Sequence, residues 1–183
     1  MKKFYFMLLI IILLLSGCGD KTRKYTDIRD VNYTKLISSR NKYIGDASSD
    51  VRILNYLPGR EFLSGIEIKN KRLIVNYGIE KNTKLTEDDL HSFWNEERIK
   101  KIFMYNSSML LSLIDNAESV TLQLNMNPKL SLDIDKTEVS SFYKEISDEK
   151  DLGKFNKSLL DQIGSEKKIK EFYDDNKINI YAF

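Results

Sequence analysis

Cysteine and histidine, which commonly bind metals or take part in catalysis, each occur once in this 183-residue chain, as Cys18 and His91. A single cysteine forms no intramolecular disulfide. One cysteine and one histidine do not supply a Cys/His zinc site. His91 has Trp94 one helical turn further on but no recognisable acid–base partner, so we expect it to face solvent on an amphipathic helix. The sequence therefore predicts no metal, no cofactor and no enzymatic activity.

Alternating acidic residues at 133–138 are the next candidate for chemistry. Asp133, Asp135 and Glu138 are spaced as in a calcium-binding loop. An EF-hand loop needs glycine at its sixth position and glutamate at its twelfth, and this chain has Glu138 and Lys144 there. We therefore interpret the segment as a strand end followed by a helix cap.

Cys18 stands at the end of an apolar segment, and this position suggests a different chemistry for its thiol. Two lysines precede an uncharged run of twelve residues, 4–15. A bilayer span needs about twenty residues, whereas about 7–15 suit the apolar region of a signal peptide. The following Leu15-Ser16-Gly17-Cys18 resembles a bacterial lipobox. The resemblance implies cleavage by signal peptidase II before Cys18, a lipid on its sulfur and acylation of its amine, with palmitate as an expected acyl group.

This lipobox predicts a protein held on the extracytoplasmic face of the cell membrane by lipid on Cys18. Each buried CH₂ contributes about 0.8 kcal/mol, and two acyl chains give stable anchoring. An uncleaved N-terminal anchor is the alternative. We expect a signal peptide at 1–17, the lipidated cysteine with a polar tether at 18–30, and one globular domain at 31–183.

The charge balance argues against a nucleic-acid partner. The net charge of +2 comes from Lys2 and Lys3, because the other 27 basic residues equal the 27 acidic ones. Nucleic-acid binding usually requires a concentrated basic face, and the sequence contains no such block.

Hydrophobic periodicity predicts an α+β fold, with one antiparallel sheet built from two hairpins and a long helix across one face. The long helix is expected from about Glu96 to Asp115, after a shorter helix in which Thr86 is the N-cap and Asp89 completes a capping box. Strands are expected near 61–69, 72–80, 118–127 and 129–135. Further helices are expected at 31–40, from Asp46 or Ser48 to Pro58, and at 136–146, 151–163 and 165–176, with a last short strand at 177–183.

Asn106 falls on the apolar face of the long helix, where it must find hydrogen bonds or cost roughly 1–3 kcal/mol. Gly45 permits a positive φ, and Asp46 can cap the next helix. Two hypotheses stay open for these residues. In one, Asn106 binds the backbone of the turn at 43–46 and locks it to the long helix. In the other, these residues form a ligand site together with Asn116.

Three blocks of the sequence resemble an uncharacterised extracytoplasmic domain of Gram-positive bacteria, over roughly residues 40–135. The blocks are 43–58, 65–80 and 106–124. The matching positions are Tyr43, Gly45, Asp46, Leu57, Pro58, Asn106, Leu110, Leu113, Ile114, Asp115, Asn116 and Val120. The domain occurs in small lipoproteins and at the extracellular end of membrane proteins related to β-lactam-sensing metalloproteases. Its function is unknown, so the resemblance implies a fold and a location but no catalytic residues.

These observations predict a non-enzymatic module anchored by Cys18 that binds an envelope component or a sensor protein. The alternative is a receptor for a small molecule or cell-wall fragment. Such a receptor needs a concave apolar pocket with a few polar groups. The aromatic residues considered for its lining are Tyr43, Tyr77, Phe93 and Trp94.

Overall fold

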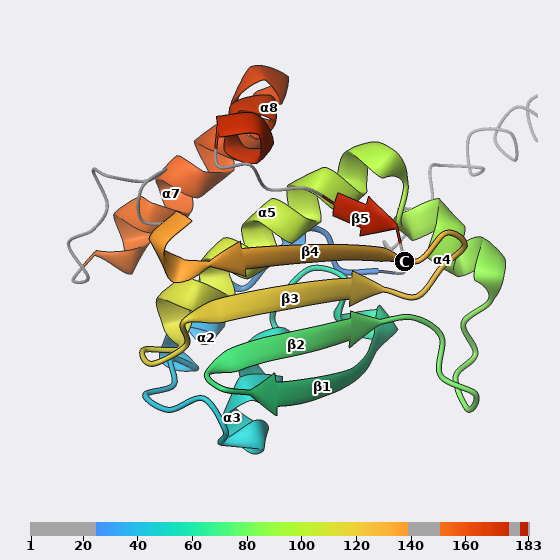
Figure 1. Cartoon of the computed structure of the whole chain (residues 1–183), viewed down its shortest axis with the longest axis horizontal. Helices are drawn as coiled ribbons and strands as arrows, with labels where there is room; N and C mark the ends of the chain where they lie inside the picture. The colour runs from blue at the N-terminus through green and yellow to red at the C-terminus, as the bar shows by residue number, and fades with distance from the viewer. Residues whose placement is uncertain (1–24, 139–150, 176–179, 183) are drawn as a thin grey trace, which may run out of the picture.

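Four strands from the middle of the chain and a short strand near its C-terminus form a five-stranded sheet in the order β1-β2-β3-β4-β5 (Figure 1). The computed structural model describes residues 25–138, 151–175 and 180–182. The strands are β1 (Leu63–Lys69), β2 (Arg72–Tyr77), β3 (Ser119–Leu124), β4 (Leu130–Asp135) and β5 (Ile180–Ala182). Helices cover one face of the sheet, so the predicted α+β class is confirmed.

Both predicted hairpins are present. Strands β1 and β2 are antiparallel and are joined by Asn70 and Lys71, whose φ angles of 48° and 61° are those of a type I′ turn. Strands β3 and β4 are also antiparallel, from Ser119 opposite Asp135 to Leu124 opposite Leu130. The short terminal strand pairs antiparallel with β4.

The expectation of a wholly antiparallel sheet is wrong at its centre, where β2 and β3 run parallel from Arg72 opposite Ser119 to Tyr77 opposite Leu124. The reason lies in the connection between the two hairpins. Helices α4 (Glu87–Phe93) and α5 (Glu96–Leu113) return the chain to the starting end of β2. A strand that follows such a helical crossover runs in the same direction as the strand before it.

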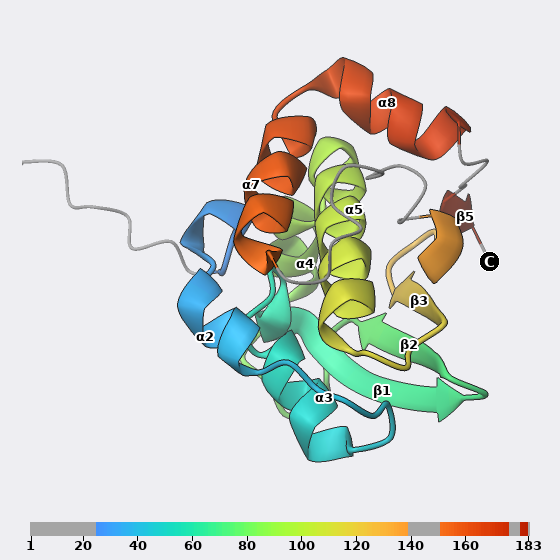
Figure 2. The ribbon, with the colours of Figure 1, turned by 90° about the vertical axis from the view of Figure 1, so that its left-hand side faces the viewer.

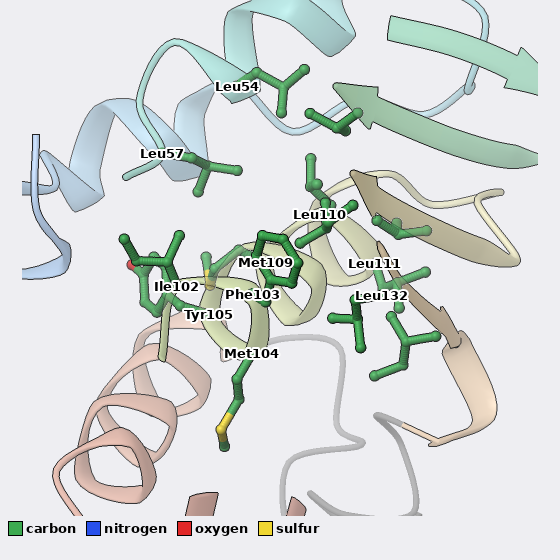
Figure 3. Close-up of a cluster of buried hydrophobic side chains, with 14 of the residues drawn as sticks. Leu54, Leu57, Ile102, Phe103, Met104, Tyr105, Met109, Leu110, Leu111 and Leu132 are labelled. Carbon is green, nitrogen blue, oxygen red and sulfur yellow. The ribbon is translucent and has the colours of Figure 1, made fainter. Parts of the chain in front are cut away.

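The long helix α5 lies at the centre of the molecule, between the sheet and the other helices (Figure 2). Its sheet-facing side packs on β3, and its far side contacts α7 (Leu152–Ile163) and α8 (Glu166–Asp175). Figure 3 shows Phe103 and Leu110 of α5 between Leu54, which ends α3 (Ala47–Leu54), and Leu132 of β4. Because α5 is covered on two sides, twelve of its 18 residues are buried.

The predicted helix starts are confirmed. Thr86 and Asp89 form a reciprocal capping box at α4. Asp46 caps α3, and its side chain accepts a hydrogen bond from the Ser49 amide. The expected helix at 31–40 is α2 (Tyr33–Ser38). Residues 136–138 are helical, and the rest of the helix expected at 136–146 lies outside the described residues.

The tether predicted at 18–30 is too long, because its last six residues belong to the folded domain. The Tyr25 ring packs against Phe62 and Phe93, with centroids 5.1 and 5.8 Å away. The Thr26 backbone and hydroxyl both donate to Glu61, and Asp27 precedes the short helix η1 (Ile28–Asp30). A tether would therefore be confined to 18–24.

No helix within the described ranges combines the length and the hydropathy needed to cross a bilayer.

Candidate functional site

Asn106 and the turn at 43–46 are held in different parts of the structure. Asn106 is fully buried in the middle of α5, where its Nδ2 donates to the Pro58 carbonyl and to the Tyr77 hydroxyl, each at 3.0 Å. The turn contacts the other end of that helix, beyond Leu113. Eight residues of helix separate Asn106 from Ile114, or about 12 Å. The hypothesis that Asn106 binds the turn is therefore wrong.

The role of Asn106 is to join three core segments. Its amide connects α5 to Pro58 and to the end of β2 through Tyr77. Burial raises the pKa of Tyr77 well above its ordinary value, so this hydroxyl stays neutral. Two neighbouring serines, Ser107 and Ser108, bond back to carbonyls of the preceding helical turn at 2.7 Å. All these groups support the core.

The turn is locked to the end of α5 by other side chains. Three successive backbone amides each donate to a side chain: Tyr43 to Asn41 Oδ1 at 3.2 Å, Ile44 to Asn116 Oδ1 at 2.6 Å and Gly45 to Asp50 Oδ2 at 3.1 Å. Gly45 has a φ of 107°, a conformation that side chains disfavour. We call residues 41–46 the locked turn, because side chains hold its backbone in place. Asn116 has the role that the sequence analysis expected of Asn106.

The backbone of Asn41 attaches the locked turn to the long helix directly. Its amide donates to the Leu113 carbonyl at 2.8 Å, and its carbonyl accepts from the Asp115 amide at 2.9 Å. Arg40 adds an ion pair to Asp115 at 2.7 Å. These bonds fix the turn against the segment that leads into β3.

Asp50, like Asn41, holds the locked turn but was missed by the sequence analysis. It is fully buried and accepts hydrogen bonds from Asn41 Nδ2 at 2.9 Å and from the Gly45 amide. Burial raises the pKa of its carboxyl above the ordinary value, against the lowering effect of these bonds. The sequence did contain a signal for this burial. Asp50 precedes the apolar Ile53 by three residues and Leu54 by four, so all three lie on the same face of one helix.

The locked turn presents one large aromatic side chain to solvent. Tyr43 is 59% exposed, more than any other large hydrophobic residue in the described ranges. Lys42 Nζ lies 5.4 Å from the centre of its ring. Asp46 is also exposed, and hydrogen bonds from Ser49 and Ser48 lower its carboxyl pKa, as expected of a helix cap.

The aromatic pocket considered for a small-molecule receptor is not formed by those residues. Tyr77, Phe93 and Trp94 are at most 2% exposed, and Trp94 has ring centroids 5.0 Å from each of the other two. Tyr43 is exposed on the locked turn, where Lys42 lies over its ring. Tyr77, Phe93 and Trp94 are part of the hydrophobic core.

The face of the sheet that no described helix covers forms a shallow polar groove of about 1220 Å³. Its lining combines polar and charged side chains with the apolar Ile74. Arg72 donates to Ser119 at 3.0 Å and to Asp133 at 3.2 Å, and Thr121 also donates to Asp133. We call this surface the polar sheet face; its described lining includes no aromatic ring.

The acidic segment 133–138 behaves as a strand end and helix cap. Asp133 is engaged by Arg72, and the Asp135 amide donates to Glu138 at 2.6 Å. Within the described ranges, no three acidic, histidine or cysteine side chains lie close enough together to hold a metal ion. His91 is exposed on α4, as expected.

Cys18 lies outside the described residues, so its lipidation stays a prediction. Comparison with protein families gives a match over residues 36–137 to a model described as domain of unknown function (DUF4825). This span agrees with the resemblance expected over roughly 40–135. Comparisons with curated proteins and with solved structures gave no significant match.

Proposed function

This chain belongs to the DUF4825 family, whose function is unknown, and we propose that it is a lipid-anchored, non-enzymatic interaction module on the extracytoplasmic face of a Gram-positive cell membrane. Its partner in this proposal is another envelope component or a membrane sensor protein. The observation that carries the proposal is the position of Cys18, directly after an apolar run and seven residues before Tyr25.

The short distance from Cys18 to the folded domain supports a module that works close to the membrane. Seven residues reach at most about 25 Å when fully extended. The first described residues, in blue, lie on the helix side of the molecule, and the polar sheet face lies on the opposite side (Figure 2). An anchor attached on the helix side would leave the polar sheet face directed away from the lipid.

Two observations favour binding over catalysis. Ser107 and Ser108 would be candidate nucleophiles, but their hydroxyls donate hydrogen bonds to carbonyls of their own helix. Asp50 would be a candidate base, but its carboxyl accepts a hydrogen bond from the locked turn. The exposed Tyr43 is presented on a fixed backbone, as expected of an interaction residue, because Tyr gives a large contact area at low entropic cost.

Replacing Cys18 by alanine tests the anchor. We expect the Cys18→Ala protein to accumulate as an uncleaved precursor or to be released, and to lose metabolic labelling by palmitate. The matched control is Ser16→Ala, which keeps a small residue beside the cleavage site and leaves the thiol in place. A Cys18→Ala protein that still fractionates with membranes at the processed size would contradict the proposal.

Photo-crosslinking in intact cells tests the interaction. A photoreactive residue at Gln123, on the polar sheet face, should give a discrete adduct with an envelope protein. The same residue at Lys157, exposed on α7, serves as the control position. Equal or absent adducts at both positions would count against the polar sheet face as the binding surface.

A further inference from the structure

The outer edge of β1 is unpaired by any described strand. Strand β1 is the first strand of the sheet, and only its inner edge pairs with another described strand, β2. The two-residue turn after Lys69 makes Lys69 and Arg72 a hydrogen-bonded pair, and the alternation of antiparallel pairs makes Glu67 and Ile74 the next one. The amide and carbonyl groups of Ile66 and Ile68 therefore point outward, away from β2.

The side chains on this edge alternate between the two faces of the sheet. Ile68 lies opposite the buried Leu73 on the helix side, yet it is 36% exposed because nothing described lies beyond the edge. Glu67 and Lys69 lie on the polar sheet face and form an ion pair at 2.8 Å, with side chains 55% and 68% exposed. The edge thus offers apolar surface on one side and one charge of each sign on the other.

This edge is complementary to a second copy of itself, and we propose that two chains pair through β1. The strands would run antiparallel about a two-fold axis at Ile68. In this register Ile68 meets Ile68 of the second copy, with two reciprocal backbone hydrogen bonds. Glu67 lies opposite Lys69 of the second copy, and Lys69 lies opposite its Glu67. Opposite charges at directly facing positions stabilise a sheet.

Neighbouring registers are less favourable. Centring the axis on Glu67 would bring two like charges face to face, which is destabilising. Centring it on Ile66 would place Glu67 opposite Gly65, next to the irregularity between Leu63 and Gly65. The backbone directions permit the register centred on Ile68, and the charges of Glu67 and Lys69 select it.

The symmetry of this pairing suits two anchored chains, and in this respect the inference rests on the proposed function. A continuous ten-stranded sheet places the two-fold axis perpendicular to the sheet. Both helix layers, and with them both Tyr25 ends, then lie on the same side, so both lipids can enter one bilayer. The strand contact is smaller than the roughly 1,200–2,000 Å² of stable soluble complexes. We therefore expect pairing on the membrane, where anchoring raises the effective concentration.

Cysteine crosslinking of the full-length protein in native membranes tests the register. In a hydrogen-bonded antiparallel pair the facing Cα atoms lie about 5.5 Å apart, within the range of a disulfide. Ile68→Cys should therefore give a disulfide-linked dimer under mild oxidation. The matched control is Ile66→Cys on the same strand face, for which the two Cα atoms would lie about 13 Å or more apart. Failure of Ile68→Cys to crosslink, or equal crosslinking of Ile66→Cys, would overturn the proposal.

Charge exchange supplies a second test in the Ile68→Cys background. Glu67→Lys and Lys69→Glu should each lower the crosslinked fraction about three- to tenfold, because each creates two like-charged pairs. The double exchange Glu67→Lys/Lys69→Glu should restore it, and restoration also shows that the single variants did not simply misfold. A double exchange as weak as the single ones would contradict the pairing.

The wild-type chain separates this inference from the lipid anchor. Its only thiol, Cys18, cannot react with maleimide when it carries a thioether lipid. Reactive thiol in wild-type membranes would refute the anchor. Unreactive wild-type protein without Ile68→Cys dimers would refute the pairing alone.

Discussion

The locked turn makes a quantitative prediction about Asn116. Its Oδ1 accepts the Ile44 amide at 2.6 Å, and α3 and the segment leading to β3 flank this bond. Asn116→Ala removes the acceptor and leaves the amide without its partner in a half-buried place. A net hydrogen bond contributes about 0.5–1.5 kcal/mol, and an unsatisfied buried donor costs about 1–3 kcal/mol. We therefore expect a loss of about 2 kcal/mol in the free energy of unfolding.

Asn116→Asp is the matched control, because it keeps the side-chain size and an oxygen at the same position. It should lose less than half as much stability as Asn116→Ala at neutral pH. Denaturant unfolding of the mature protein measures both values, and about 2 kcal/mol corresponds to a fall in Tm of about 4–8 °C for a domain of this size. Hydrogen exchange gives the local readout, since the Ile44 amide should lose protection in the alanine variant only. Equal stability of the alanine variant and the wild type, or unchanged protection of Ile44, would refute the lock.

Two further predictions concern the same region and the core. Burial raises the pKa of Asp50, so the folded state binds the carboxyl proton more tightly than the unfolded state does. The protonated carboxyl therefore contributes to the free energy of unfolding fully below about pH 3.9, the ordinary pKa of Asp. This contribution is lost as the pH rises through the folded-state pKa. Asp50→Asn should abolish this pH-dependent contribution. In denaturant titrations the wild type should therefore lose stability relative to the variant between acid and neutral pH. A difference in stability that does not change with pH would contradict the raised pKa of Asp50. Gly59 has a φ of 79°, and a Cβ there would lie 2.6 Å from Trp94 Cζ2, so Gly59→Ala should lower the free energy of unfolding by about 2 kcal/mol or more. Gly65, with no atom within 4 Å of its Cβ position, is the control, and equal effects of alanine at both sites in thermal unfolding would refute the steric argument.

Local signals predicted most of the elements, and long-range contacts explain the errors. The Thr86 capping box and the alternation in β3 depend on neighbours in the chain, so sequence reasoning found them. The parallel β2–β3 junction depends on where a helical crossover returns, which no local pattern encodes. The Tyr25 ring packs against residues 37 and 68 positions away, so it looked like part of a polar tether.

The candidate site shows the same division in finer detail. The periodicity of α5 correctly placed Asn106 on a buried face, where it needs hydrogen bonds. It could not choose between two polar backbone segments, because both Pro58 and the turn lie far away in sequence. Asp50 lies five residues after Gly45 in the sequence, whereas Asn116 lies 72 residues after Ile44. Only the packed structure brings those two side chains to one backbone.

Burial of Asp50, which holds the locked turn, lowers the free energy of unfolding at neutral pH, and this cost bears on the proposed function. Asp50 is a fully buried carboxyl that receives only neutral donors, and burial without a cation disfavours its charged form. What these bonds do achieve is a fixed backbone beneath an exposed Tyr43. A contact made by a residue that is already ordered loses less entropy on binding. The fixed backbone of this turn therefore favours a surface that recognises a partner.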